Sequence, residues 1–407
     1  MSRNQYALAI IFLALVQTMA QAQTFNVLYY LSGSSGIWPE AGLIQDASGN
    51  LYGTATYGGD GCGDDSCGVV FMLDTNGKET VLHNFAGPDG DMPEAPLLRD
   101  DKGNLYGTTA AGGNSNQGAV FKIDTAGNET VLHSFVSKDG CQPRQGLIMD
   151  EAGNLYGTTS ACGNVAHGSG TIFRLSKNGE YAVLHNFAGS PSDGAAPDYG
   201  RLTLDTAGNL YGVTFEGGNE TNCSNYYVGC GVLYKLSKDG KFVILHRFAG
   251  GTSDGCYPYG TVALDGDGGL HGTTFGCGAH GWGIIWKVCK EGVETIRHNF
   301  AGGTSDGCNP EGSAVLDAKG NLYGNSRFCG AYGGGWDGGT VWELSKKNVL
   351  TLLHSFDQSD GAQPWGEVLR TENGTLFGTT TYGGSDDCSY GCGTVWSVAF
   401  PGPEDSR

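Results

Sequence analysis

The sequence predicts an all-β fold: a seven-bladed β-propeller of four-stranded blades, closed by an N-terminal strand that completes the last blade. Three observations predict it. One phrase recurs seven times at a nearly fixed period, each copy contains four strand-like runs, and the two ends of the chain are complementary.

The recurring phrase is Asn-Leu-Tyr-Gly-Thr-Thr, which is complete at residues 104–109 and 154–159. Its leucine position is occupied by Leu51, Leu105, Leu155, Leu210, Leu270, Leu322 and Leu376. The spacing between these leucines stays between 50 and 60 residues, so each repeat has about 55 residues and the variation falls in loops.

Each copy contains four short runs rich in Val, Leu, Ile and aromatic residues. In the third copy these runs cover residues 146–150, 155–159, 171–175 and 181–187, separated by Gly, Asn and Asp. Such runs predict antiparallel strands, because β-branched and aromatic residues favour strands and the separating residues favour turns. A helical solenoid would need a period of 3.6 residues, which is absent.

The two ends of the chain predict how the ring closes. The last copy ends after its third run, at residues 393–398. A run that matches the missing fourth strand stands at the other end, at residues 27–31. Pairing of these runs would complete the seventh blade and remove the sheet edges that an open arrangement would expose.

The repeat resembles GloVer, a tandem repeat of exported bacterial proteins that carry varied anchors. The phrase Asn-Leu-Tyr-Gly-Thr-Thr and the elements Gly-Gly, Val-Phe-Lys-Ile and Val-Leu-His-Ser-Phe carry this resemblance over nearly the whole mature chain. The resemblance implies no established activity, and this sequence shows no recognisable anchor. The order of motifs around each Asn-Leu-Tyr is also similar, more weakly, to NHL-type propellers.

The first 22 residues have the features of a secretory signal peptide. Arg3 precedes an apolar stretch at residues 7–16, and Ala20-Gln21-Ala22 forms a cleavage site. We therefore expect a signal peptide at 1–22, the propeller at 23–400 and a short tail at 401–407. The protein is expected to be secreted or periplasmic, with no membrane span after cleavage; a membrane anchor is the alternative, but the stretch is short for one.

The formal net charge of −19 argues against partners that are themselves strongly anionic. An acidic surface repels nucleic acid and anionic membranes, so neither is expected as a partner. The sequence contains no phosphate-cradling loop, nucleophile elbow or cluster of metal-ligating histidines, and we expect no cofactor and no metal. The protein is expected to be a monomer.

Thirteen cysteines in an exported chain predict disulfides. Three pairs share a separation of 21 residues and connect the loop before the first strand to the loop after the second: Cys141–Cys162, Cys256–Cys277 and Cys308–Cys329. Three other pairs lie within one loop: Cys62–Cys67, Cys223–Cys230 and Cys388–Cys392. Zinc is the rival interpretation of the close pairs. Cys289 is left over and is expected to be a buried thiol.

Residues that repeat in most blades are interpreted as structural. Six histidines occupy the same place in the fourth strand: His83, His133, His185, His246, His298 and His354. Two rings of aspartates are expected to form turns: Asp46, Asp100, Asp150, Asp205, Asp265 and Asp317, and Asp89, Asp139, Asp193, Asp254, Asp306 and Asp360. Calcium binding by the second ring is the alternative.

A binding site is expected where the copies differ. The residue after the proline that precedes each first strand varies: Glu40, Glu94, Arg144, Asp198, Tyr259, Glu311 and Trp365. These side chains are expected at the mouth of the central channel, where they could bind a cationic or sugar-like ligand; drift on a solvated rim is the alternative. Aromatic residues gather on the same face: Trp38, Tyr199, Tyr257, Tyr332, Trp336, Tyr382 and Tyr390.

Two functions follow from this arrangement. The first is a non-catalytic binding or scaffold protein of the cell envelope or secretome, with a glycan or protein as ligand. The second is a hydrolase or lyase acting on polysaccharide through the carboxylates of the mouth. A propeller supports both functions.

Overall fold

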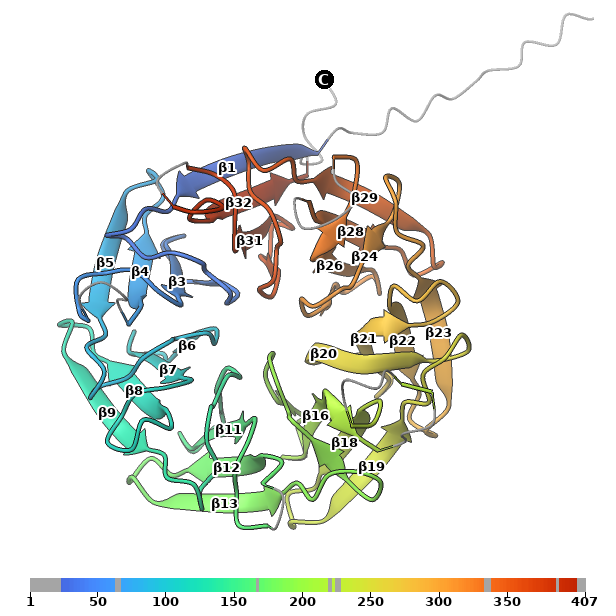
Figure 1. Ribbon diagram of the computed structural model, residues 1–407, viewed down its shortest axis with the longest axis horizontal. Coiled ribbons are helices and arrows are strands. Elements are labelled where there is room, and N and C mark those ends of the chain that lie inside the picture. The colour runs from blue at the N-terminus through green and yellow to red at the C-terminus, as the bar shows by residue number, and fades with distance from the viewer. Residues whose placement is uncertain are drawn as a thin grey trace, which may run out of the picture.

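The computed structural model describes residues 23–62, 67–165, 168–218, 222–223, 228–332, 338–385 and 388–400. These residues form a ring of seven antiparallel sheets, each with four strands (Figure 1). The predicted all-β, seven-bladed propeller is therefore confirmed. The expected signal peptide and C-terminal tail lie outside the described residues. No helix in the described part of the chain is long and apolar enough to cross a membrane.

Each blade runs from an innermost first strand to an outermost fourth strand. The first strands are β2 (Ile44–Gln45), β6 (Leu98–Arg99), β10 (Ile148–Met149), β15 (Thr203–Leu204), β20 (Gly255–Leu264), β25 (Val315–Leu316) and β30 (Leu369–Arg370). The second strands are β3 (Leu51–Ala55), β7 (Leu105–Thr109), β11 (Leu155–Thr159), β16 (Leu210–Thr214), β21 (Leu270–Cys277), β26 (Leu322–Ser326) and β31 (Leu376–Thr380).

The outer strands are equally regular. The third strands are β4 (Val69–Leu73), β8 (Ala119–Ile123), β12 (Thr171–Leu175), β18 (Val232–Leu236), β22 (Ile284–Val288), β28 (Thr340–Leu344) and β32 (Thr394–Ala399). The fourth strands are β5 (Glu79–Asn84), β9 (Glu129–Ser134), β13 (Tyr181–Asn186), β19 (Phe242–Arg247), β23 (Glu294–Asn299), β29 (Leu350–Ser355) and, from the N-terminus, β1 (Thr24–Tyr30). Two short ladders pair β14 (Gly194–Ala195) with β17 (Glu216–Gly217) and β24 (Gly307–Cys308) with β27 (Phe328–Cys329).

The seventh blade joins the two ends of the chain, as predicted. Strand β1 pairs antiparallel with β32, from Thr24 opposite Ala399 to Tyr30 opposite Thr394. The outermost strand of the last blade is thus the first strand of the chain (Figure 1).

Antiparallel order gives the ring two different faces. The turns between first and second strands and between third and fourth strands emerge on one side, which we call the turn face. The connections between second and third strands, and those from one blade to the next, emerge on the other side, which we call the loop face.

The glycine of the recurring Tyr-Gly phrase is required by packing within each blade. A Cβ atom at Gly157 would lie 2.6 Å from the ring of Phe173 and 3.0 Å from Leu147. The same clash with the aromatic residue of the third strand would occur in the other six blades. The small residue therefore lets a large ring lie flat against the second strand.

The core between blades is built from aromatic pairs. Phe135, which follows β9, packs edge-on against Phe173 of the next blade with ring centroids 5.3 Å apart. Both side chains are completely buried. Equivalent contacts recur around the ring, for example between Phe85 and Phe121 at 5.0 Å and between Phe248 and Trp286 at 5.5 Å. Burial of such rings supplies most of the adhesion between neighbouring blades.

The second and third strands of the third copy match the prediction, but its first strand is shorter than expected. The sequence predicts a strand over residues 146–150, whereas β10 covers only Ile148–Met149. Gly146 instead donates its backbone N–H to the carbonyl of Gly200 at 2.8 Å, in the next blade. The chain therefore leaves its own sheet near the axis of the ring, where neighbouring blades are close enough to bond to each other.

Candidate functional site

All six predicted disulfides form. Their Cα–Cα distances lie between 5.2 Å and 5.6 Å, which suits a disulfide. Cys289 is free, as predicted, but the expectation that it is buried is wrong. It lies half-exposed in the turn after β22, because a tight turn between outer strands leaves little to cover it.

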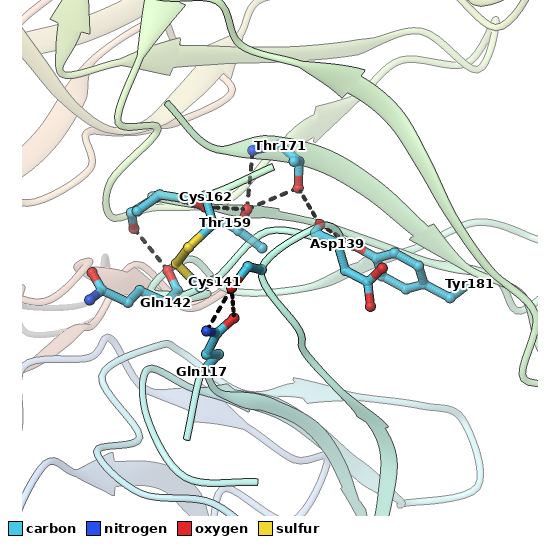
Figure 2. Close-up of a disulfide and its surroundings, with 11 residues drawn as sticks. Gln117, Asp139, Cys141, Gln142, Thr159, Cys162, Thr171 and Tyr181 are labelled. Carbon is cyan, nitrogen blue, oxygen red and sulfur yellow. Dashed lines mark hydrogen bonds between the residues drawn. A yellow bond between two sulfur atoms is a disulfide. The ribbon is translucent and has the colours of Figure 1, made fainter. Parts of the chain in front are cut away.

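The disulfides hold connections of the loop face in place. Cys141 forms an antiparallel backbone bridge with Ala161, the residue before Cys162. Cys162 has a φ of 62°, in the left-handed region that glycine favours. Beside them, the Thr171 hydroxyl donates to the Asp139 carbonyl at 3.0 Å, and the Tyr181 hydroxyl donates to the same carbonyl at 2.8 Å (Figure 2). The connection is therefore fixed both by covalent and by hydrogen bonds.

The repeated histidines and the second ring of aspartates form pairs between neighbouring blades. The Nε2 atoms of five histidines lie 2.8 to 3.3 Å from the aspartate that leads into the next blade, as in His354 and Asp360. In the sixth pair, His133 lies 3.4 Å from Asp139. These contacts agree with the structural interpretation of both sets of residues.

Two of these pairs have a third group that the sequence analysis missed. Glu129 joins His83 and Asp89, and Glu294 joins His246 and Asp254, with ligand atoms within 4.8 Å of one another. Burial, with the charge of Asp89, raises the pKa of Glu129 to about 7. Each trio can share a proton or hold a metal ion; in the interface between β9 and β13, Tyr181 stacks on His133 instead.

The first ring of aspartates forms the turns that were predicted. The Asp150 carboxylate accepts hydrogen bonds from the backbone N–H groups of Ala152 and Asn154 at 3.0 Å and 2.8 Å. It also accepts one from the Asn154 amide at 2.8 Å and one from the Tyr156 hydroxyl at 3.0 Å. These bonds explain why Asp, Asn and Tyr recur together in the repeat.

Most of the predicted mouth residues meet at the axis of the ring. Glu40, Glu94, Arg144, Tyr259, Glu311 and Trp365 line one cavity of about 20 Å³. Asp198 does not line it, but its charge contributes to the raised pKa of Glu94. The cavity has room for roughly one water molecule. These side chains are buried or half-buried, so the alternative of drift on a solvated rim does not describe them.

A first ion pair fills one side of this centre. Arg144 Nε lies 3.5 Å from a carboxylate oxygen of Glu94, which is only 4% exposed. Arg144 also donates to the Tyr199 hydroxyl at 2.9 Å. Burial raises the pKa of Glu94 to about 7 although Arg144 opposes the shift. The single positive charge predicted at the mouth is thus used to neutralise a neighbouring acid.

A second ion pair contains a residue that the sequence analysis missed. Arg327 donates from one terminal nitrogen to both oxygens of Glu311, at 3.1 Å and 3.0 Å. Its guanidinium lies over the Trp365 ring, 4.0 Å from the centroid, and Trp365 donates to the Tyr259 hydroxyl at 2.8 Å. Arg327 follows its second strand at a place that other blades give to small or neutral residues, such as Thr56 and Ala110, and this difference was the available signal.

A third network connects the fourth and seventh blades across the axis. Arg201 Nε donates to Glu367 at 3.1 Å, and the Ser313 hydroxyl donates to the same carboxylate at 2.9 Å. The Thr261 hydroxyl also donates to Glu367. These residues directly precede the inward leucine or valine of each blade and were not considered in the sequence analysis. They close the axis beneath the predicted site.

Glu40, like Asp198, is an acid of the centre with no arginine bonded to it among the described residues. Burial and the nearby charge of Glu94 raise its pKa to about 8, although Arg327 and Arg144 lower it. Glu40 therefore carries a proton at neutral pH and can donate it. Glu94 and Glu311 face arginines, but Glu94 Oε2, Arg144 Nε and Asp198 Oδ1 are buried without a hydrogen-bond partner among the described residues.

The aromatic residues of the loop face fall into two groups. Tyr332 and Tyr390 are exposed by 67% and 80% and form part of the surface. Tyr257 is buried, and Trp38 packs against Tyr382 with ring centroids 5.5 Å apart. Tyr199 belongs to the central network, and Trp336 lies outside the described residues.

Two exposed residues on this face were missed. Val228 and Trp282, like Tyr332 and Tyr390, lie in connections between second and third strands and are exposed by 59% and 45%. The four residues come from the fourth, fifth, sixth and seventh blades in succession. We call them the exposed crescent. Isolated exposed apolar residues are common, but a series on adjacent loops is typical of a binding surface.

Comparisons with solved structures give the same fold. The extracellular domains of a proposed hybrid two-component system and a proposed one-component system, both from B. thetaiotaomicron, align with TM-scores of 0.56 and 0.57 at 12% and 11% identity. Each alignment covers 92% of this chain, which spans only 41% and 40% of those chains. A proposed 6-phosphogluconolactonase from Bacteroides fragilis aligns with a TM-score of 0.51 at 16% identity, covering 83% of this chain and 88% of that one. At these identities the similarity concerns the fold alone.

No curated protein matches the sequence. The family model of the Gloeobacter/Verrucomicrobia repeat matches residues 14–227 and 220–402, which agrees with the seven blades and with the motifs that the repeat carries. The chain therefore belongs to the Gloeobacter/Verrucomicrobia repeat family.

Proposed function

We propose that this protein is an exported, non-catalytic binding protein that holds its ligand on the loop face, at the exposed crescent of Val228, Trp282, Tyr332 and Tyr390. The observation that carries the proposal is the contrast between this crescent and the centre. The crescent presents large side chains to solvent, whereas the central acids Glu94 and Glu311 are paired with arginines. Six disulfides support a location in an oxidising compartment, secreted or periplasmic.

The closed centre argues against catalysis at the predicted mouth. A cavity of about 20 Å³ cannot admit a sugar ring. A catalytic acid or base also needs a free position toward a substrate, whereas Glu311 and Glu94 face arginines. Tyrosine and tryptophan on fixed loops, by contrast, provide a surface suited to sugar rings or to apolar side chains of a protein partner.

A glycan array probed with the mature protein tests this proposal. Binding is expected to weaken about tenfold or more when Trp282→Ala and Tyr390→Ala are combined, because both rings are then absent from the surface. Val293→Ala with Val349→Ala is the matched control, since these exposed residues lie in turns of the opposite face. Equal loss in both double variants would contradict a site at the crescent. Absence of glycan binding, with capture of a protein partner that depends on Trp282 and Tyr390, would identify the ligand as a protein.

One observation favours the second candidate, a hydrolase or lyase acting on polysaccharide. Glu40 has a pKa raised to about 8 by burial and by the charge of Glu94, which suits a general acid at neutral pH. A reducing-end assay on a panel of polysaccharides tests it. Turnover that is lost in Glu40→Gln and kept in Tyr390→Ala would favour catalysis over the binding function.

A further inference from the structure

One hollow in the described part of the protein is separate from the predicted mouth and shares no lining residue with it. It is a groove of about 610 Å³ on the turn face, between the fifth blade (β20 to β23) and the sixth blade (β25 to β29, Figure 1). The turn after β20 and the turns after β25 and β28 form its walls, and β21, β22 and β23 form its floor. Its polar lining includes His271, Lys287, Arg297, Lys319, Lys346 and Asn348.

Two of these residues break the repeat at places where the other blades agree. His271 stands where five blades have tyrosine and one has phenylalanine: Tyr52, Tyr106, Tyr156, Tyr211, Tyr323 and Phe377. Arg297 stands where the six other fourth strands have leucine: Leu28, Leu82, Leu132, Leu184, Leu245 and Leu353. Both exceptions occur in the same blade and point to the same groove. A repeat that keeps leucine elsewhere gains nothing in packing from a half-buried arginine at this place.

Arg297 is held firmly but without a carboxylate. Its Nε donates to the side-chain oxygen of Asn348 at 2.9 Å, and one terminal nitrogen donates to the Ser345 carbonyl at 3.0 Å. The other terminal nitrogen lies 3.4 Å from Nδ1 of His271. Among the residues that the structure describes, no carboxylate lies within 4.0 Å of this guanidinium. A guanidinium has five N–H groups, so two remain for a ligand.

His271 orients this arginine. The histidine is 3% exposed, and its Nε2 lies 2.9 Å from the Asp265 carboxylate, to which it donates. Its Nδ1 then offers a lone pair to Arg297, which requires the neutral ring. Burial, together with the charges of Arg297 and Lys287, lowers the pKa of His271 although Asp265 opposes the shift. The neutral form is therefore the form that prevails at neutral pH.

Two of the three carboxylates of the groove are already occupied by their own turns, and the third, that of Asp267, is exposed. Asp265 accepts bonds from His271, from Lys287 at 2.8 Å and from two backbone N–H groups. Asp317 accepts bonds from Asn321, from the backbone of Lys319 and from Tyr323. The side chains of Lys319 and Lys346 are exposed, and no ion pair forms on either of them within the described residues. The groove thus offers unneutralised cations on a protein whose net charge is −19.

We propose that this groove binds a small ligand through a carboxylate or a phosphate group, with Arg297 as the main contact and Lys319 and Lys346 at the rim. Two free N–H groups of one guanidinium match two oxygens of such an anion. The volume suits a ligand of the size of one or two sugar rings. This site is independent of the exposed crescent, which lies on the opposite face.

Isothermal titration with three probes tests this proposal: inorganic phosphate, glucuronate and, as a neutral comparison, glucose. Phosphate or glucuronate is expected to bind and glucose is not, and the stronger of the two anions identifies the group that the site prefers. Arg297→Leu, which restores the residue of the other blades, is expected to weaken anion binding about tenfold or more. Arg247→Leu is the matched control, because it removes the same charge from another fourth strand outside the groove and should leave the affinity unchanged.

A second variant keeps the test independent of folding. If Arg297→Leu lowers the thermal midpoint, Lys319→Ala with Lys346→Ala changes only exposed side chains and is expected to weaken binding about threefold to tenfold. The proposal is overturned if neither anion binds at millimolar concentration. It is also overturned if the anion affinity of Arg297→Leu, or of the lysine pair in a folded protein, equals that of the native protein.

Discussion

The two faces of this ring follow opposite rules. On the turn face, one set of hydrogen bonds recurs almost unchanged: the Asp150 turn of the third blade and the Asp205 turn of the fourth have the same donors at nearly the same distances. On the loop face, the blades differ in their central residues and in their exposed side chains, and their disulfides follow two patterns. Residues that are the same in most copies therefore build the blade, and residues that differ between copies are candidates for a function particular to one blade. The groove beside Arg297 is an exception on the turn face, because His271 and Arg297 differ there from the equivalent residues of the other blades.

The largest effect is expected from the centre of the loop face. Arg327→Ala would leave the buried carboxylate of Glu311 without its partner, and the free energy of unfolding should fall by about 3–5 kcal/mol. Urea denaturation measures this loss. Glu311→Gln in the same chain should recover a large part of it, because the uncompensated charge is then removed. No recovery would show that Arg327 acts by packing on Trp365 rather than by pairing with Glu311.

The disulfides of the loop face should have the next largest effect. Cys141→Ser with Cys162→Ser opens a loop of 21 residues and should lower the free energy of unfolding by about 3 kcal/mol. The second blade offers the converse experiment, since Asp91 and Ala111 form there the backbone bridge that Cys141 and Ala161 form in the third. Asp91→Cys with Gly112→Cys should therefore create a seventh disulfide, detected by a rise in the thermal midpoint and by peptide mapping. A fall in the midpoint would show that the two blades differ in backbone geometry after all.

A turn of the opposite face should have a smaller effect. Asp150→Ala removes four hydrogen bonds and is expected to cost about 2 kcal/mol. Asp74→Ala is the comparison, because this exposed turn between third and fourth strands receives only two backbone bonds from Asn76 and Lys78. Chemical denaturation of both variants should rank Asp150 above Asp74. The reverse order would show that the number of hydrogen bonds does not determine how much each turn stabilises the protein.

The smallest effect should be a difference in pH dependence between the faces. Burial raises the pKa of Asp150, but the bonds from Asn154 and Tyr156 outweigh it and lower the pKa below 3.8. Its contribution to stability is therefore present above pH 4 and is lost as the pH falls through the folded pKa. Burial raises the pKa of Glu40 to about 8 and that of Glu311 to about 7, so these acids bind more protons in the folded state and stability falls as the pH rises from 5 to 8.

Stability measured across pH should accordingly peak near pH 5, at the acidic end of the usual range. Glu40→Gln removes one of the groups responsible and should flatten the decline between pH 5 and 8. Asp150→Asn is the matched variant of the turn face and should leave that decline unchanged. A decline that stays the same in Glu40→Gln would show that its carboxyl is ionised throughout this range.

The fold could be predicted from the sequence because the same pattern of residues recurs in all seven copies of the repeat. Strand, turn and packing signals agree in each copy, and the large residues at Phe173 and its equivalents require the glycine that the phrase contains. The cysteine pairs could be predicted for the same reason, since equal separations in equal contexts imply equal bonds. The short first strand could not, because Gly146 bonds to another blade, and this contact depends on how closely blades approach at the axis.

The candidate sites were predicted less completely. The position that holds Glu94 and Glu311 was identified by its variation, and Arg144, which pairs with Glu94, occupies the same position in the third blade. Arg327, which pairs with Glu311, comes from another position, directly after a second strand. Arg327 and Arg297 each break the pattern of a position that is otherwise small or apolar, and Arg201 stands at a position that holds Glu367 in the seventh blade and uncharged residues in the other five. Comparing every position of the repeat, rather than the most variable one, would have revealed all three. The partner of each arginine, however, can be identified only from the three-dimensional structure. Arg201, for example, lies in the fourth blade and donates to Glu367 in the seventh.

The closure of the seventh blade has a mechanical consequence. Thr24 lies opposite Ala399, so both chain ends leave the sheet at the same end of the β1–β32 ladder. A force that pulls the ends apart would act on these hydrogen bonds one pair after another, as in unzipping, and not on all of them at once in shear. Such a ladder yields at low force. Stretching this molecule by its ends should therefore first convert the ring into an open arc, with the other six blades still folded.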